Sequence, residues 1–302
     1  MNWNYPHRVK NEFITQINGI SITLKREDTL HPKISGNKFR KLKYNFLAYD
    51  KKKYNGVATF GGAYSNHLVA TAAAGKEMGI PTFGFVRGEE LSNKKRNPSL
   101  AYCEANGMKL FFLSREEYRE KKQNSRVIKY LNDHKWFCLE EGGTNDLAIQ
   151  GCTEILQSTD ACFDTICCAV GTGGTFLGLL SSIKSTQHVV GWDVVNDTKV
   201  KATIEGLATA NKQYDLISSI AMGGYGRATN ELVDFINDFY KNYNILLDPI
   251  YTGKLLFGIF AMIKKGEWRW GQNVLIIHTG GLQGIEGFNQ KQKQLGRPCI
   301  IV

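Results

Sequence analysis

The chain has 302 residues, of which 42% are hydrophobic and 22% charged, enough for one large core or for two fused domains. Its 38 basic residues exceed its 28 acidic ones, and the formal net charge of +10 favours anionic partners without indicating a fold. The longest apolar run has nine residues, 255–263, against roughly 20 for a membrane-spanning helix, and no hydrophobic stretch follows a basic N-terminus, so we expect no membrane span and a cytoplasmic protein.

The first predicted element is a β-hairpin near the N-terminus. Asn18-Gly19, within residues 16–20, is a turn signal, and the β-favouring residues 21–25 flank it. Beyond the hairpin, short apolar runs alternate with helix-like segments almost to the end of the chain. That alternation is typical of a parallel sheet covered by helices, so the predicted fold class is α/β.

The predicted strands of this alternating part are 57–60, 82–86, 109–113, 165–170, 189–195, 216–221 and 274–278. The predicted helices include 65–78, 97–106 and one that begins at Gly174. The chain has no internal repeat, low-complexity tract or long linker. We therefore expect two closely packed α/β domains.

The seven cysteines are odd in number and show no repeated Cys-x-x-Cys spacing. We therefore expect neither a disulfide scaffold nor a metal site. Cys167 and Cys168 lie within a predicted apolar strand, where a free cysteine behaves as a small hydrophobic residue, so we expect both in the core.

Three predicted strands end in glycine-rich turns, and open parallel sheets bind ligands beyond the carboxyl ends of their strands. The first turn contains Gly61-Gly62, an aromatic residue, and then Ser65, Asn66 and His67. A capped helix start would explain Ser65 or Asn66 alone. It would not explain a glycine pair and an aromatic residue in the same turn.

The second turn, Gly171-Thr172-Gly173-Gly174-Thr175, follows an apolar strand and opens a helix. Its backbone N–H groups, its two hydroxyls and the helix N-terminus suit a phosphate dianion. It is not a Walker loop, because no Gly-Lys-Ser/Thr follows, and it lacks the dinucleotide spacing, so a single phosphate is the better interpretation. The alternative is a merely tight strand-to-helix turn.

The third turn contains His278, Thr279, Gly280 and Gly281 and would bring Thr279 to the same rim of the sheet. A lone histidine such as His278 is more often structural than catalytic.

The most informative segment is Ser35-Gly36-Asn37-Lys38, which precedes a helical stretch. A lysine held there in one pose, with its pKa lowered by burial, suits imine chemistry. The competing interpretation is a basic surface from Lys33 to Lys53 that binds nucleic acid, although the interleaved aromatic and glycine residues typical of single-strand binders are absent. The co-occurrence of Lys38, the Ser65-Asn66 turn and the phosphate loop favours the enzymatic interpretation.

Taken in order, these motifs resemble the fold-type II pyridoxal-phosphate (PLP) enzymes of the tryptophan synthase β-like group. Within that group the chain is similar to the 1-aminocyclopropane-1-carboxylate deaminase and D-cysteine desulfhydrase family. The matching stretches, spread over most of the chain, are 25–28, 35–42, 65–66, 171–175, 223–226, 248–254 and 278–281.

The resemblance implies a role for each cofactor-binding motif. Lys38 would form the imine link to the cofactor aldehyde, Asn66 would bind the ring hydroxyl, and the loop 171–175 would hold the phosphate. Thr279, with Thr252 nearby, would lie against the pyridine nitrogen, and a neutral partner there favours elimination.

The resemblance also implies a substrate site. Ser65 and Asn66 would bind the substrate carboxylate, and His67 would lie beside them. Tyr225 and Tyr251 would face the substrate side chain. Lys38 would remove the α proton, so the implied catalytic residues are Lys38, Ser65, Tyr225 and Tyr251.

Departures from the family pattern bear on the substrate. Thr252 stands where the ring-opening deaminases carry Glu, which favours desulfhydrase-like elimination. His67 replaces the common Gln, and Leu282 and Gln283 replace the usual Ala and Pro. The chain is also somewhat short for the family, so a peripheral loop or helix is expected to be trimmed.

The leading prediction is therefore a PLP-dependent lyase that eliminates sulfide from a small amino acid such as D-cysteine, giving pyruvate and ammonia. The alternative is a deaminase, or hydrolase, that converts 1-aminocyclopropane-1-carboxylate to 2-oxobutyrate and ammonia. A non-enzymatic nucleic-acid-binding protein is the remote alternative; we expect no nucleic-acid partner. The expected architecture is a homodimer whose large cofactor domain comprises 1–44 and 146–302, with a small α/β domain, 45–145, inserted.

Overall fold

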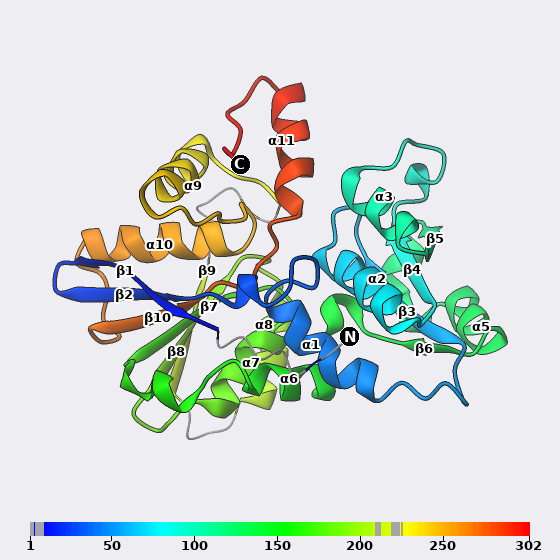
Figure 1. The fold of residues 1–302 in the computed structure, drawn as a ribbon, viewed down its shortest axis with the longest axis horizontal. Helices are drawn as coiled ribbons and strands as arrows, with labels where there is room; N and C mark the ends of the chain where they lie inside the picture. The colour runs from blue at the N-terminus through cyan, green and yellow to red at the C-terminus, as the bar shows by residue number, and fades with distance from the viewer. Residues whose placement is uncertain (1–2, 4–8, 209–212, 219–223, 225) are drawn as a thin grey trace.

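The structure is a computed structural model that describes residues 3, 9–208, 213–218, 224 and 226–302 (Figure 1). Within these residues, six strands form the larger sheet in the order β1-β2-β10-β7-β8-β9. They are β1 (Asn11–Ile17), β2 (Ile20–Lys25), β7 (Thr165–Val170), β8 (His188–Asp193), β9 (Gln213–Ser218) and β10 (Asn273–Ile277). The pair β1–β2 is antiparallel and the other pairs are parallel.

The predicted hairpin is confirmed, because β1 and β2 meet at Asn18-Gly19, where both residues have positive φ angles of 50° and 80°. The predicted strands 165–170, 189–195 and 274–278 correspond to β7, β8 and β10 within two residues at each end. Strand β9 covers the start of the predicted strand 216–221, whose last residues lie outside the described part of the chain.

A smaller, fully parallel sheet has the order β5-β4-β3-β6 in the described chain. Its strands are β3 (Gly56–Gly61), β4 (Thr82–Arg87), β5 (Met108–Leu113) and β6 (Trp136–Cys138). The first three confirm predicted strands. Strand β6 was not predicted, because three half-buried residues at the sheet edge carry no pattern.

Helices cover both sheets (Figure 1). The α-helices are α1 (Asn37–Leu47), α2 (Asn66–Met78), α3 (Pro98–Ala105), α4 (Arg115–Glu120), α5 (Ser125–Asp133), α6 (Asp146–Thr153), α7 (Gly174–Ser182), α8 (Thr198–Leu207), α9 (Asn230–Tyr243), α10 (Thr252–Lys264) and α11 (Gly284–Gln294). Short 3-10 helices are η1 (Glu27–Thr29), η2 (Glu89–Leu91), η3 (Lys121–Gln123), η4 (Glu141–Gly143) and η5 (Ser158–Cys162). None of the described helices is long and apolar enough to cross a membrane.

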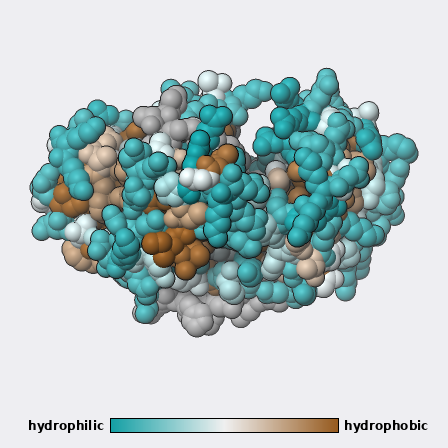
Figure 2. Space-filling view, turned by 90° about the horizontal axis from the view of Figure 1, so that it is seen from above, coloured by the Kyte–Doolittle hydropathy of each residue, from teal (hydrophilic) through white to brown (hydrophobic). Residues whose placement is uncertain are grey.

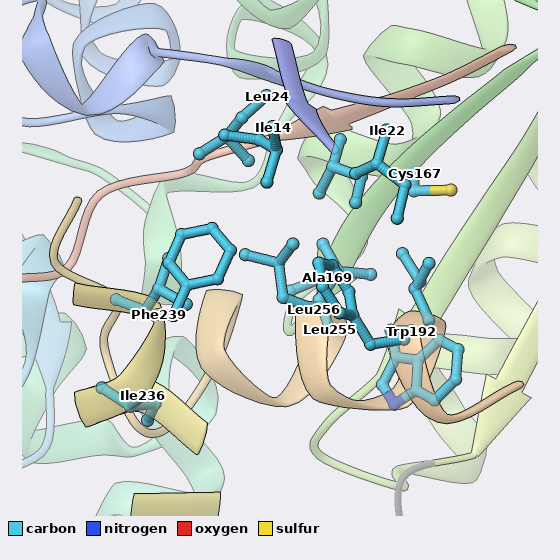
Figure 3. Packing of buried hydrophobic residues seen from close by; sticks show 14 of the residues in the cluster. Ile14, Ile22, Leu24, Cys167, Ala169, Trp192, Ile236, Phe239, Leu255 and Leu256 are labelled. Atoms are coloured by element: carbon cyan, nitrogen blue, oxygen red, sulfur yellow. The ribbon is translucent and has the colours of Figure 1, made fainter. Parts of the chain in front are cut away.

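The two faces of β7 pack against different helix layers. Cys167 and Ala169 belong to a core cluster with α9 and α10, in which Leu255 and Leu256 point from α10 toward the strands (Figure 3). Cys168, on the other face, belongs to a cluster with α6 and α7. Alternate residues of one strand are therefore buried on opposite faces, as expected in a parallel sheet covered on both sides. The prediction that Cys167 and Cys168 lie in the core is confirmed.

The two sheets draw on different parts of the chain. Strands 56–138 form the smaller sheet, and strands before and after that stretch form the larger one. Helix α1 lies between the two halves in Figure 1 and packs against both α2 and α6. The predicted domain boundaries near residues 45 and 145 remain a prediction, and α1 runs across the first of them.

Candidate active site

The start of α1 lies against the carboxyl end of β10. Gly36 precedes the helix with a φ angle of 61°, and a Cβ atom built on it would lie 2.0 Å from the carbonyl oxygen of Thr279. The Asn37 backbone N–H donates to that same oxygen at 3.4 Å. Only glycine permits this close approach with a positive φ angle. The result is that Lys38, in the first turn of α1, lies beside the strand end that carries Thr279.

The same turn is bonded to the predicted phosphate loop. The Asn37 side-chain amide donates to Thr175 Oγ1 at 2.8 Å. Gly173 precedes α7 with a φ angle of 85° and supplies no side-chain cap for the helix. The first N–H groups of α7 therefore face the loop without a capping side chain, which is the arrangement that binds anions.

Two lysines lie one turn apart on α1, of which Lys41 is buried and Lys38 is half-buried. Lys38 Nζ donates to the carbonyl oxygen of Gly142 at 3.3 Å, and Lys41 Nζ donates to that same oxygen at 3.3 Å. Lys41 Nζ also donates to Thr144 Oγ1 at 3.0 Å and to Thr172 Oγ1 at 3.2 Å. Lys41 thereby connects α1 to the phosphate loop.

Burial lowers the pKa of Lys38 to about 7, with a further contribution from the charge of Lys41. Burial also lowers the pKa of Lys41. Within the described residues neither ammonium group has a carboxylate partner, and burying an unpaired cation is costly. Lys41 and a partly protonated Lys38 beside an uncapped helix N-terminus fit a phosphate dianion, and with a pKa of about 7 the amine of Lys38 is about half neutral near pH 7.

Sequence reasoning missed Lys41, Gly142 and Thr144. Gly142 and Gly143 have φ angles of 68° and 72° and lie between the two halves of the site. A Cβ atom on Gly142 would lie 2.7 Å from Thr172 Cγ2, and one on Gly143 would lie 2.9 Å from His67 Cε1. The spacing of three residues between Lys38 and Lys41 was the one available signal, because residues i and i+3 share a helix face.

Ser65 and Asn66 lie at the start of α2, as predicted. Ser65 is the N-cap, and its hydroxyl accepts from the Leu68 N–H at 3.3 Å. The side-chain nitrogen of Asn66 lies 2.8 Å from a Cβ atom built on Gly281, so this amide adjoins the turn that follows β10. The structure therefore brings the first and third glycine-rich turns together. The contacts of Ser65 and Asn66 with cofactor and substrate remain predictions.

His67 lies in a different environment from Ser65 and Asn66. It is 2% exposed, and its Nε2 atom lies 2.8 Å from Thr59 Oγ1. Its Nδ1 atom has no hydrogen-bond partner within the described chain. Burial, with the charges of Lys38 and Lys41, lowers the pKa of His67 well below its usual value, so the imidazole is neutral. Its predicted contact with substrate remains a prediction.

Thr252 and Thr279 lie together, with 3.4 Å between their hydroxyl oxygens, and both are buried. Tyr251 lies beside the phosphate loop, since a Cβ atom on Gly171 would be 3.2 Å from its Cε1 atom. The buried carboxylate of Asp248 orders this turn by accepting from three backbone N–H groups, those of residues 250, 251 and 252. Sequence reasoning gave Asp248 no separate role.

Two further residues complete the comparison with the predictions. Tyr225 lies outside the described residues. His278 is fully buried, with Nε2 2.7 Å from the Leu246 carbonyl oxygen and Nδ1 accepting from the Gly280 N–H at 3.2 Å. Both ring nitrogens are therefore hydrogen-bonded to backbone groups, as expected of a structural histidine.

The basic residues that the nucleic-acid alternative needs lie only partly on the surface. Lys33 and residues 51–53 are exposed, whereas the cations of α1 are half-buried or buried. Lys41 is 2% exposed. Arg40 makes two hydrogen bonds of 2.9 Å to Glu27, and Lys43 is bonded to Glu154 at 2.8 Å. The cations of α1 are therefore engaged within the fold, which removes part of the surface on which this alternative rests.

Known proteins with similar sequences carry deaminase and desulfhydrase names. A protein of Thermotoga maritima named "Putative 1-aminocyclopropane-1-carboxylate deaminase" is 32% identical over 88% of this chain and 90% of its own length. The Arabidopsis thaliana "Bifunctional D-cysteine desulfhydrase/1-aminocyclopropane-1-carboxylate deaminase, mitochondrial" is 29% identical over 89% of this chain and 74% of its own. These names include no hydrolase, so that part of the prediction has no support.

A solved structure described as an ACC deaminase homologue matches with a TM-score of 0.81 at 25% identity, covering 96% of this chain and 94% of that one. The predicted α/β fold class is thereby confirmed. The model of the family described as "Pyridoxal-phosphate dependent enzyme" matches residues 8–280. The buried amine of Lys38 and the adjacent anion site are what pyridoxal phosphate requires, a group that reacts with its aldehyde and a cradle for its phosphate. The chain belongs to the pyridoxal-phosphate-dependent enzyme family.

Proposed function

We propose that this enzyme eliminates a β-leaving group from a small amino acid, with D-cysteine as the leading substrate and pyruvate, ammonia and sulfide as products. The observation that carries the proposal is the half-buried Lys38 and the buried Lys41 beside the predicted phosphate loop. Bound pyridoxal phosphate supplies an electron sink for the pair of electrons left on the substrate α carbon. The chain supplies the proton transfers and holds the substrate.

Lys38 is the proposed base at the α carbon. Its amine is buried, its pKa is about 7, and within the described chain its one recorded hydrogen-bond partner is the Gly142 carbonyl. A base works best when its pKa lies near the working pH, because it is then both unprotonated and able to hold the proton. Ser65 and Asn66, at the start of α2, are the proposed ligands of the substrate carboxylate.

Thr252 and Thr279 are the proposed neighbours of the pyridine nitrogen. Both are uncharged, and both are buried. A neutral partner leaves that nitrogen largely unprotonated, which weakens the electron sink and favours loss of a good leaving group such as sulfide. This reasoning favours elimination over ring opening.

Purified protein supplied with pyridoxal phosphate tests the proposal. We expect a yellow protein with the absorbance band of an imine-linked cofactor, loss of that band in Lys38→Ala, and pyruvate release from D-cysteine by the native enzyme but not by Lys38→Ala. Lys43→Ala, on the same helix but bonded to Glu154, is the matched control and should retain both properties. A protein that stays colourless would contradict the proposal.

Deamination of 1-aminocyclopropane-1-carboxylate is the second candidate function. It is supported by the name of the Thermotoga maritima relative and by the place of Tyr251 beside Gly171. A panel of D-cysteine, L-cysteine, D-serine and the cyclopropane amino acid separates the two. Release of 2-oxobutyrate from the cyclopropane compound, with D-cysteine inert, would favour the deaminase.

A cytoplasmic homodimer remains part of the proposal. Light scattering of the eluted protein should give twice the 33.9 kDa mass of one chain. A mass of 33.9 kDa would show a monomer.

A further inference from the structure

An aromatic residue joins the two halves of the molecule next to the proposed substrate site. Tyr64 directly precedes Ser65, in the turn between β3 and α2. A Cβ atom built on Gly287 of α11 would lie 2.4 Å from Cε1 and 2.6 Å from Cδ1 of this ring. Those distances place the ring directly on the backbone of α11. Gly287 is buried, while Tyr64 is 50% exposed.

The contact extends along one side of α11 toward the site. A Cβ atom on Gly284 would lie 3.8 Å from Asn66 Oδ1, and one on Gly281 would lie 2.8 Å from Asn66 Nδ2. Three glycines at intervals of three residues thus face the turn 64–66. Helix α11 follows β10, whose carboxyl end carries Thr279, whereas the turn 64–66 follows a strand of the smaller sheet (Figure 1).

The backbone conformation at Gly287 does not require glycine. It lies inside a helix, where glycine is less favourable than alanine, and its φ angle is not positive. The close approach of the Tyr64 ring supplies the reason. The molecular surface is indented between the two halves (Figure 2), and the contact of Tyr64 with α11 joins one half to the other.

We infer that Tyr64 is a positioning residue, which sits on Gly287 and sets the distance across the cleft between the Ser65-Asn66 turn and the strand end that carries Thr279. Ser65 and Asn66 are the proposed substrate ligands, so in this respect the inference rests on the proposed function. Tyr64 itself touches no reacting atom in this assignment. It acts through the two residues that follow it.

A double-mutant cycle with Gly287→Ala and Tyr64→Ala tests the inference on the cofactor-loaded enzyme. The added methyl group of Gly287→Ala must displace the ring, so we expect kcat/KM for D-cysteine to fall about tenfold or more, mainly through KM, because misplacing a binding group by about 1 Å is costly. In the Tyr64→Ala background the methyl group has room, and we expect the same substitution to change kcat/KM less than about twofold.

Thermal unfolding supplies a readout that does not depend on catalysis. Gly287→Ala should lower Tm in the native background and raise it in the Tyr64→Ala background, because alanine is the better helix former once the clash is gone. Gly206→Ala in α8 is the control, since nothing lies within 4 Å of its Cβ position, and it should raise Tm in both backgrounds.

Each outcome is decisive. Equal effects of Gly287→Ala in the two backgrounds, on Tm and on KM, would overturn the inference. If Gly287→Ala does not fold, a folded double variant supports the contact and an unfolded one contradicts it. Failure of the proposed function would appear as absent D-cysteine turnover with the coupling in Tm intact, so the two failures are distinguishable.

Discussion

Buried lysines in two regions of the molecule have different kinds of partner. In the larger sheet, Lys25 on β2 is fully buried, and its Nζ lies 2.7 Å from Asp160 Oδ2. Asn11 bonds to both partners. In the candidate site, Lys41 is buried and Lys38 is half-buried, and their recorded acceptors are carbonyl and hydroxyl oxygens.

This difference distinguishes Lys25, a lysine with a structural partner, from Lys38 and Lys41, the lysines of the proposed binding site. Lys25 forms its ion pair with a carboxylate of the same chain, and this pair links β2 to η5. Lys38 and Lys41 lack a carboxylate partner among the described residues, and in the proposed function the cofactor phosphate supplies the balancing charge. A buried cation without an anion therefore identifies the binding site more specifically than burial alone.

Of the predicted effects, the largest should come from breaking the ion pair between Lys25 and Asp160. We expect Lys25→Met to lower the free energy of unfolding by about 3–5 kcal/mol, because Asp160 would remain buried and unpaired. Guanidinium denaturation of the cofactor-free protein measures this. The double variant Lys25→Met/Asp160→Leu should recover part of the loss, and a single variant within about 1 kcal/mol of the native protein would contradict the comparison.

Removing the cation in the cleft should affect binding instead. We expect Lys41→Met to raise the dissociation constant of pyridoxal phosphate about 100-fold, or about 2.7 kcal/mol, since the phosphate loses a buried charge-assisted hydrogen bond. Spectrophotometric titration measures it. Lys43→Met is the control, because Lys43 is bonded to Glu154, and comparable losses in the two variants would count against the assignment.

The pH dependence of cofactor attachment sharpens the comparison. The amine of Lys38 attacks an aldehyde only when neutral, and its pKa is about 7. The attachment rate should therefore rise about tenfold per pH unit below 7 and level off above it. Lys41→Met should move the midpoint to higher pH, because the charge of Lys41 lowers the pKa of Lys38. Stopped-flow absorbance measures the attachment rate. A midpoint that does not move in Lys41→Met would contradict this coupling.

The smallest effect is expected for Thr144→Val. The Thr144 hydroxyl accepts from Lys41 at 3.0 Å and is hydrogen-bonded to Thr172. Its loss should weaken cofactor binding about fivefold, or about 1 kcal/mol, the typical net value of one hydrogen bond. Thr203→Val, on the exposed side of α8, should leave the titration unchanged.

The site could be predicted from the sequence where its signals are local. Apolar runs ending in glycine pairs located three strand ends, and Lys38 stood out because glycine and asparagine precede it in a helix start. Lys41 and Gly142 were missed because they meet only in the folded chain, 101 residues apart in sequence. Strand β6 was missed because three half-buried residues lack a periodic pattern.

Identification of the lysine that bonds to the cofactor tests the central claim most directly. Borohydride reduction of the loaded native enzyme, followed by peptide mass spectrometry, should place the reduced pyridoxal group on Lys38, with Lys41 unlabelled. Labelling of Lys41 instead, or specific labelling of neither lysine, would contradict the account of this cleft.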